Sequence, residues 1–168
     1  MKKLLLLLIA ISCLALCGCG GSNDDSGNGL TPEEKEFAEI VYEFQAAINS
    51  KDKNIDKAKN LLYADGVYNK ETYDQFCTKL AKFLNKAEDI RFVIGDIGVI
   101  PTNLDEQADV RAASLITYTY KGEKKTIDEL LVFSVIKGIS SKRGIKEFKK
   151  YNPRDDSDII SAFPPDLN

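Results

Sequence analysis

The side chains available for acid–base chemistry are carboxylates and tyrosines, because the chain of 168 residues contains no histidine. Histidine is the commonest general base, a frequent zinc ligand and the usual partner of a nucleophilic serine or cysteine. Asp96 shares the strand parity of Phe92 and Ile94. It could therefore point into the interior, where burial would raise its pKa and suit it to act as a base. Tyr118 and Glu129 could line the same cavity.

Each of these side chains also has a purely structural interpretation. Asp96 directly follows Gly95, and glycines within a strand commonly mark a bulge or a strand end. Tyr118 alternates with core residues, and Glu129 suits a solvated charge near a strand end. No spacing among them matches a catalytic set, so the sequence assigns no catalytic residue and leaves an enzymatic role open.

Metal, cofactor and nucleic-acid sites are not predicted. Asp155-Asp156-Ser157-Asp158 lacks the loop glycine and the distal glutamate of a calcium-binding EF-hand, so a solvated acidic stretch is the better interpretation. The chain has 23 basic and 26 acidic residues, and the lysines and arginine of 142–150 alternate with acids and apolar residues. Binding of nucleic acid requires clustered basic charge. We therefore expect no cofactor, no metal and no nucleic-acid partner.

The N-terminus is organised like a secretory leader. Met1-Lys2-Lys3 is cationic, and the apolar run from Leu4 to Cys17 follows it. Fourteen helical residues rise about 21 Å, which is short of the ~30 Å hydrocarbon core of a bilayer. The run is therefore typical of a signal peptide, predicted over residues 1–18, rather than of a membrane span.

Leu16-Cys17-Gly18-Cys19 resembles the lipobox of bacterial lipoproteins. That resemblance implies cleavage before Cys19, a diacylglyceryl thioether on its sulfur, an acylated amine, and membrane anchoring, since each buried CH₂ contributes about 0.8 kcal/mol. Gly20 follows in place of the aspartate that marks inner-membrane retention in many bacteria, which favours the outer membrane where the host has one. Residues 19–30 are then a lipidated cysteine and a tether, which reaches roughly 18 Å.

The other cysteines give no disulfide in this scheme. Cys13 and Cys17 leave with the leader, and Cys19 is consumed by lipidation. Cys77 lies on the apolar face of a predicted helix, where a free cysteine behaves as a small core residue.

Residues 31–168 are predicted to form a single α+β domain. Thr31, Pro32 and Glu34 form a capping box at the start of a helix that runs to about residue 49. A short helix is expected over 55–63 and a third from about residue 69 to 87, each with an apolar stripe.

The chain then changes to strand patterns at about 90–100, 107–120, 126–137 and 144–151. The third of these is apolar on both faces, whereas helices can cover only one face of a sheet. The second face therefore needs a curl, a partner or the C-terminal tail from about residue 153, which carries Ile159, Ile160 and Phe163.

The order of apolar and turn positions resembles the nuclear-transport-factor-two-like superfamily and its small bacterial lipoproteins. The positions that carry the resemblance are Phe37, residues 44–52, Ala58, residues 61–63, Tyr73, Phe76, Leu80, residues 129–133 and the last strand. The resemblance implies a cone in which helices lie on a curved antiparallel sheet of about four strands, with a cavity between them. Cystatin-like and other helix-on-sheet folds are the alternatives.

Three functions remain open on this basis. The domain could bind a small apolar ligand or a protein partner at the cell envelope. It could instead be a homodimeric structural lipoprotein. Because enzymes of the cone fold such as ketosteroid isomerase use a tyrosine and acids, it could also be an isomerase or lyase that uses Asp96 with Tyr118.

Overall fold

The computed structural model describes residues 29–50, 55–68, 71–102, 106–137 and 143–151. The leader, Cys19, most of the tether, Asp155–Asp158 and the tail from about 153 lie outside the described residues. In chain order the elements are α2 (Pro32–Asn49), α3 (Ile55–Asn60), β1 (Leu62–Tyr68), β2 (Glu71–Thr72), α4 (Tyr73–Lys86), β3 (Glu88–Pro101), β4 (Gln107–Tyr120), β5 (Glu123–Ile136) and β6 (Gly144–Lys150).

Helix α2 begins at the predicted capping box. Thr31 Oγ1 accepts a hydrogen bond from the Glu34 N–H, and the Glu34 carboxylate accepts one from the Thr31 N–H at 2.7 Å. This exchange satisfies backbone donors that the first helical turn leaves without partners. The predicted start of this helix is therefore confirmed.

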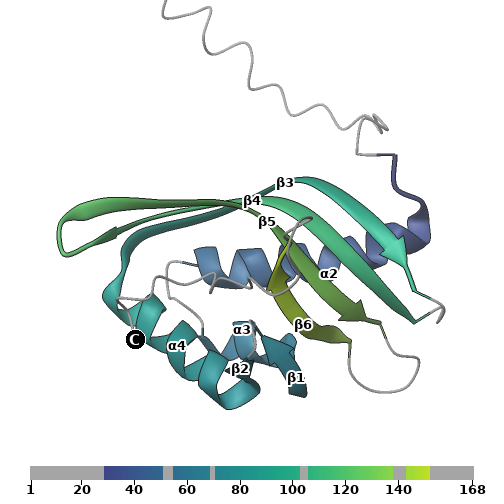
Figure 1. The fold of residues 1–168 in the computed structure, drawn as a ribbon, viewed down its shortest axis with the longest axis horizontal. Coiled ribbons are helices and arrows are strands. Elements are labelled where there is room, and N and C mark those ends of the chain that lie inside the picture. The colour runs from purple at the N-terminus through teal and green to yellow at the C-terminus, as the bar shows by residue number, and fades with distance from the viewer. Residues whose placement is uncertain (1–28, 51–54, 69–70, 103–105, 138–142, 152–168) are drawn as a thin grey trace, which may run out of the picture.

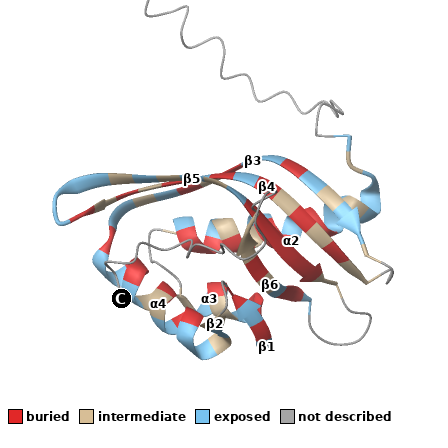
Figure 2. Ribbon diagram, viewed as in Figure 1, coloured by how far each residue is buried: buried red, intermediate tan, exposed pale blue. Residues whose placement is uncertain are grey.

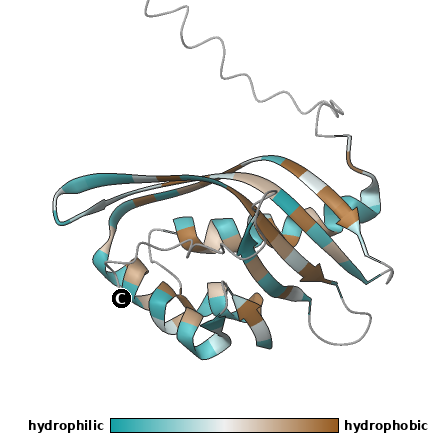
Figure 3. Cartoon of the chain, in the orientation of Figure 1, coloured by the Kyte–Doolittle hydropathy of each residue, from teal (hydrophilic) through white to brown (hydrophobic). Residues whose placement is uncertain are grey.

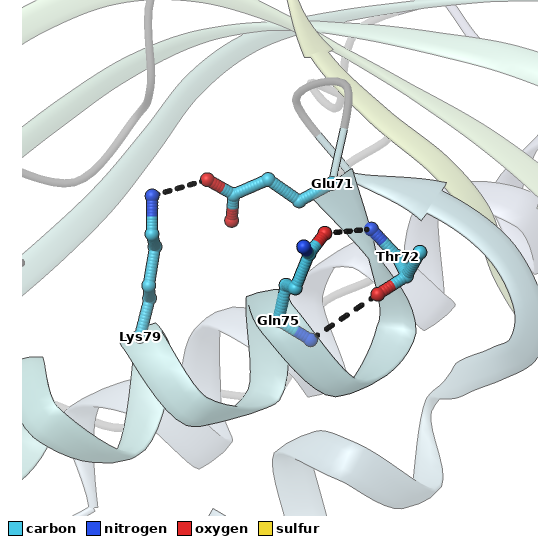
Figure 4. A network of polar contacts seen from close by, with 4 residues as sticks. All are labelled: Glu71, Thr72, Gln75 and Lys79. Atoms are coloured by element: carbon cyan, nitrogen blue, oxygen red, sulfur yellow. Dashed lines mark hydrogen bonds and ion pairs between the residues drawn. The ribbon is translucent and has the colours of Figure 1, made fainter.

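Helix α4 has a capping box of its own, shown in Figure 4. The Gln75 side chain accepts from the Thr72 N–H at 3.0 Å, and Thr72 Oγ1 accepts from the Gln75 N–H. An ion pair between Lys79 and Glu71 lies beside it. Because the box sets the first helical residue at Tyr73, the prediction that this helix begins near residue 69 is wrong.

The strands form one six-stranded sheet in the order β2-β1-β6-β5-β4-β3. Strands β3, β4, β5 and β6 form the predicted antiparallel meander, whereas β1 runs parallel to β6. The sheet is therefore mixed and has two strands more than predicted. The α+β class, with helices packed on a curved sheet, is confirmed (Figure 1).

Strand β1 accounts for part of this difference. The predicted helix over 55–63 ends at Asn60, and Leu62 already pairs with Ile145 of β6. Gly66 makes this close approach feasible, because a Cβ at that position would lie 2.4 Å from the Lys146 carbonyl oxygen. Asp65 and Gly66 interrupt this short segment, so it has no apolar–polar alternation and the strand is not visible from periodicity.

The helices cover the concave face of the sheet (Figure 1). Along β4 the even positions from Ala108 to Tyr120 are buried and the odd positions are not, which gives the banding in Figure 2. This is the parity predicted for Val110, Ile116 and Tyr118. The turn between β4 and β5 is hydrophilic and extends beyond the helices (Figure 3).

Two amide side chains attach α2 to the edge strand β3. Asn49 Nδ2 and Gln45 Nε2 donate to the Phe92 carbonyl oxygen at 2.7 and 2.9 Å. The Phe92 N–H donates in turn to Asn49 Oδ1 at 2.7 Å. Asn49 thereby gives the main chain of Phe92 the pair of hydrogen bonds that a neighbouring strand would provide.

Candidate functional site

Aromatic rings fill much of the space between the helices and the sheet. Phe133 of β5 contacts Phe44 of α2 and Phe148 of β6, with ring centroids 6.5 and 4.9 Å apart. Phe76 of α4 continues the cluster, 5.7 Å from Phe148 and 4.9 Å from Tyr68. Such pairs stabilise the core beyond simple burial and leave little room between their rings.

The buried polar side chains of the described residues do not include an acid or a base. They are Ser114 and Ser134, which are 3% and 6% exposed. Ser114 Oγ donates to the Ala112 carbonyl oxygen. The Tyr68 hydroxyl, whose pKa is raised by burial, contacts the Tyr63 and Ile145 carbonyl oxygens. Among the described residues, no carboxylate or amine side chain is thus buried in the interior, and the hydroxyls of Ser114 and Tyr68 already have carbonyl partners.

The three candidate residues named from the sequence occupy three different environments. Asp96 is exposed and lies in a β-bulge of β3, where Gly95 and Asp96 together stand opposite Ala113. Tyr118 is buried, and its ring meets Phe83 edge to face at 5.1 Å. Glu129 forms an ion pair with Lys150 of β6.

The strand register keeps two of these candidates apart. Glu129 lies opposite Ser114 on β4, whereas Tyr118 lies opposite Lys125 on β5. The environments of Asp96 and Tyr118 match the structural interpretation of each, whereas Glu129 lies in the middle of β5 in an ion pair rather than as a solvated charge near a strand end. The described residues do not assemble the three side chains into one acid–base site.

Cys77 is buried and free, as predicted for a core residue. Burial raises the pKa of its thiol, so the reactive thiolate is disfavoured. An open groove of about 590 Å³ runs over this part of α4, and its lining includes Lys59, Lys82 and Asn85.

The face of the sheet that is turned away from the helices is different in character. We call it the outer face and define it by Arg111, Leu115, Leu130, Val132 and Lys149. Leu115 and Leu130 are 39% and 38% exposed, although both lie in the middle of long strands. The expectation that one strand would be apolar on both faces is thus met by Leu130 and Val132, which point away from the buried Phe133 side.

A row of polar and charged groups crosses the same sheet further along the strands from these leucines. The Ser134 hydroxyl donates to Asp109 Oδ1 at 2.5 Å, and Glu147 Oε2 lies 3.4 Å from the same hydroxyl. Lys149 pairs with Glu147 at 3.2 Å. A shallow pocket of about 350 Å³ adjoins this polar row, with Ser134 and Glu147 in its wall.

Arg111 completes the outer face. Its guanidinium lies over the ring of Tyr151, 4.8 Å from the centroid, which is a cation–π contact. Its Nε is buried and has no hydrogen-bond acceptor among the described residues. Sequence reasoning missed this pair, because Tyr151 follows the last strand and reaches Arg111 only through the pairing of β4, β5 and β6.

The described residues hold no group of three or more acidic or cysteine side chains placed to bind a metal ion. Among the same residues, no helix combines the length and the apolar character that crossing a bilayer requires.

No protein-family model matches the sequence, and no curated protein matches it significantly. Solved structures do match the fold. A nuclear transport factor 2-like superfamily protein from Salmonella enterica serovar Typhimurium aligns with a TM-score of 0.60 at 10% identity, over 74% of this chain and 93% of that one. A ketosteroid isomerase-like protein from Erwinia carotovora atroseptica gives 0.57 at 16% identity, over 74% of this chain and all of that one.

Bd1075 from Bdellovibrio bacteriovorus also aligns, with a TM-score of 0.54 at 14% identity over 70% of this chain. This chain spans only 40% of the length of Bd1075. At such identities the similarity concerns the backbone fold. The chain thus has the cone-shaped α+β fold of nuclear transport factor 2-like proteins.

Proposed function

We propose that the chain is a lipid-anchored binding module of the bacterial cell envelope, and that its outer face binds a protein partner. The observation that carries this proposal is the exposure of Leu115 and Leu130 in the middle of the sheet, beside the cation Arg111. Apolar side chains ringed by charged ones are typical of protein interaction sites.

Aromatic packing between the helices and the sheet favours a surface site. Phe44, Phe133, Phe148 and Phe76 form a continuous cluster of ring contacts there. An isomerase or lyase would also need an acid or base facing the reacting atoms, and the exposed bulge position of Asp96 gives that alternative no support.

The anchoring part of the proposal rests on the sequence. Cys19 follows the cationic and apolar leader, and the residues between it and Leu30 carry no apolar side chain. A tether of that composition would let the domain stand clear of lipid headgroups and present its outer face laterally.

Lipidation is tested by growing the host with labelled palmitate. We expect label in the wild-type chain and none in Cys19→Ser, because the thioether and the acylated amine both require that cysteine. Cys17→Ser is the matched control, since it alters a cysteine two residues away and should keep the label. Label that persists in Cys19→Ser would contradict the anchor.

The partner surface is tested by photocrosslinking in intact host cells. A benzoylphenylalanine at Leu115 should give a discrete protein adduct, because the residue would face the partner. The control is the same probe at Tyr42 of α2, which is also 39% exposed but lies away from the outer face. Equal adduct yields at the two positions would remove the support for a specific surface.

A further inference from the structure

The described part of the chain stops on the outer face. Tyr151 follows β6, and its N–H donates to the Leu130 carbonyl oxygen at 2.8 Å. Its ring lies under the guanidinium of Arg111. The next residues therefore leave from a point directly beside the exposed leucines of the proposed partner surface.

Arg111 has an unmet hydrogen-bonding need at this point. Its Nε–H is buried, and no ion pair joins the guanidinium to a carboxylate of the described residues. A buried donor without an acceptor costs free energy, and more so when it belongs to a charged group. A carboxylate oxygen is the acceptor that suits a guanidinium best.

Residues 152–168 have the composition to meet this need. They contain four aspartates and one arginine, and the three apolar residues Ile159, Ile160 and Phe163 follow the first aspartates. Asp155 lies four residues beyond Tyr151, a span of at most about 14 Å. Leu115 lies two strand spacings across and two residues along from Tyr151, about 12 Å, which is well within reach of Ile160.

We infer that residues 152–168 dock on the outer face of their own chain. A carboxylate of Asp155–Asp158 accepts from Arg111 Nε, and Ile159, Ile160 and Phe163 cover Leu115 and Leu130. The tail then occupies the surface on which the proposed function rests, and a partner must displace it.

Disulfide trapping in the full chain, purified in detergent, tests the docking. The variant carries Leu130→Cys and Ile160→Cys. The control carries Tyr42→Cys and Ile160→Cys, and Tyr42 and Leu130 are 39% and 38% exposed. We expect mild oxidation to give an intramolecular disulfide at least tenfold faster in the first variant. Equal rates would overturn the inference, and so would a covalent dimer, because it would place the tail on a second copy.

The contact with Arg111 is tested separately by proteolysis. A protease that cleaves before aspartate should cut the tail of Arg111→Ala about tenfold faster than that of wild type, since loss of a charge-assisted hydrogen bond frees the segment. Lys149→Ala is the control, because Lys149 already pairs with Glu147 and should leave the rate unchanged. The same rate in all three proteins would overturn the role of Arg111.

Failure of this inference and failure of the proposed function can be told apart. The photocrosslink from Leu115 reports the partner whether or not the tail docks. A Leu115 adduct without disulfide trapping of the tail would support the proposed function and overturn the docking of the tail. Trapping of the tail without a Leu115 adduct would support the docking and overturn the proposed function.

Discussion

At the scale of single residues, Gly66 shows how one missing side chain permits a strand. Ala at this position would place its Cβ 2.4 Å from both the Lys146 carbonyl oxygen and the Tyr68 hydroxyl oxygen. We expect Gly66→Ala to lower the free energy of unfolding by at least ~2 kcal/mol, because backbone must move. The measurement is urea denaturation of the full chain in detergent.

Gly98 provides the control for that prediction. It lies in β3 with nothing within 4 Å of a built Cβ and without a positive φ. Gly98→Ala should change stability by less than about 1 kcal/mol, and a slight gain is expected from reduced freedom of the unfolded chain. A similar loss in both variants would show that the close contact at Gly66 is not the cause.

The Tyr68 hydroxyl should make the free energy of unfolding depend on pH in the alkaline range. Burial raises the pKa of its hydroxyl above the usual value of about 10. Below pH 10, about the usual pKa, both the folded and the unfolded chain hold the proton, so the hydroxyl makes its full contribution to the free energy of unfolding. At higher pH the unfolded chain loses the proton first, so the free energy of unfolding falls as pH rises. Tyr68→Phe should be less stable at pH 8 but should lose less between pH 9 and 11, as measured by urea midpoints.

At the scale of elements, Asn49 joins α2 to β3 through both polar groups of the Phe92 main chain. Asn49→Ala should cost about 1–3 kcal/mol, because the mutation leaves that N–H without its acceptor and removes a donor to the carbonyl. Asn85→Ala is the control, since Asn85 is an exposed asparagine on α4. Equal thermal shifts for the two variants would contradict the role of Asn49.

Elements with local signals could be predicted from the sequence, and elements formed by remote contacts could not. The capping box at Thr31 and the alternation along β4 depend on neighbours within a few residues, so they were visible. Strand β1 depends on the approach of Gly66 to Lys146 of β6, 80 residues later. The candidate site divides in the same way. The apolar pattern of Leu130 and Val132 predicts the outer face, whereas the Arg111–Tyr151 contact depends on the register of three strands and could not be predicted.

At the scale of the whole molecule, the two faces of the sheet have separate roles. Leu130 and Leu131 are adjacent in β5, yet they are 38% and 1% exposed. We expect Leu131→Ala to cost 2–5 kcal/mol through the cavity it leaves, and Leu130→Ala to cost less than about 1 kcal/mol. Thermal unfolding measures both changes in stability. Partner crosslinking should instead be reduced more by Leu130→Ala than by Leu131→Ala. Similar destabilisation by the two would mean that the outer face is part of the core.

The amide contacts of α2 also bear on how many copies can share a membrane. Open edge strands act as templates on which further chains add, and the hazard grows with local concentration. Molecules confined to a bilayer surface, as proposed, meet one another far more often than molecules in solution. With the main chain of Phe92 already occupied by Asn49 and Gln45, part of the β3 border is closed to a neighbouring strand, which hinders edge-to-edge pairing of crowded copies at this position.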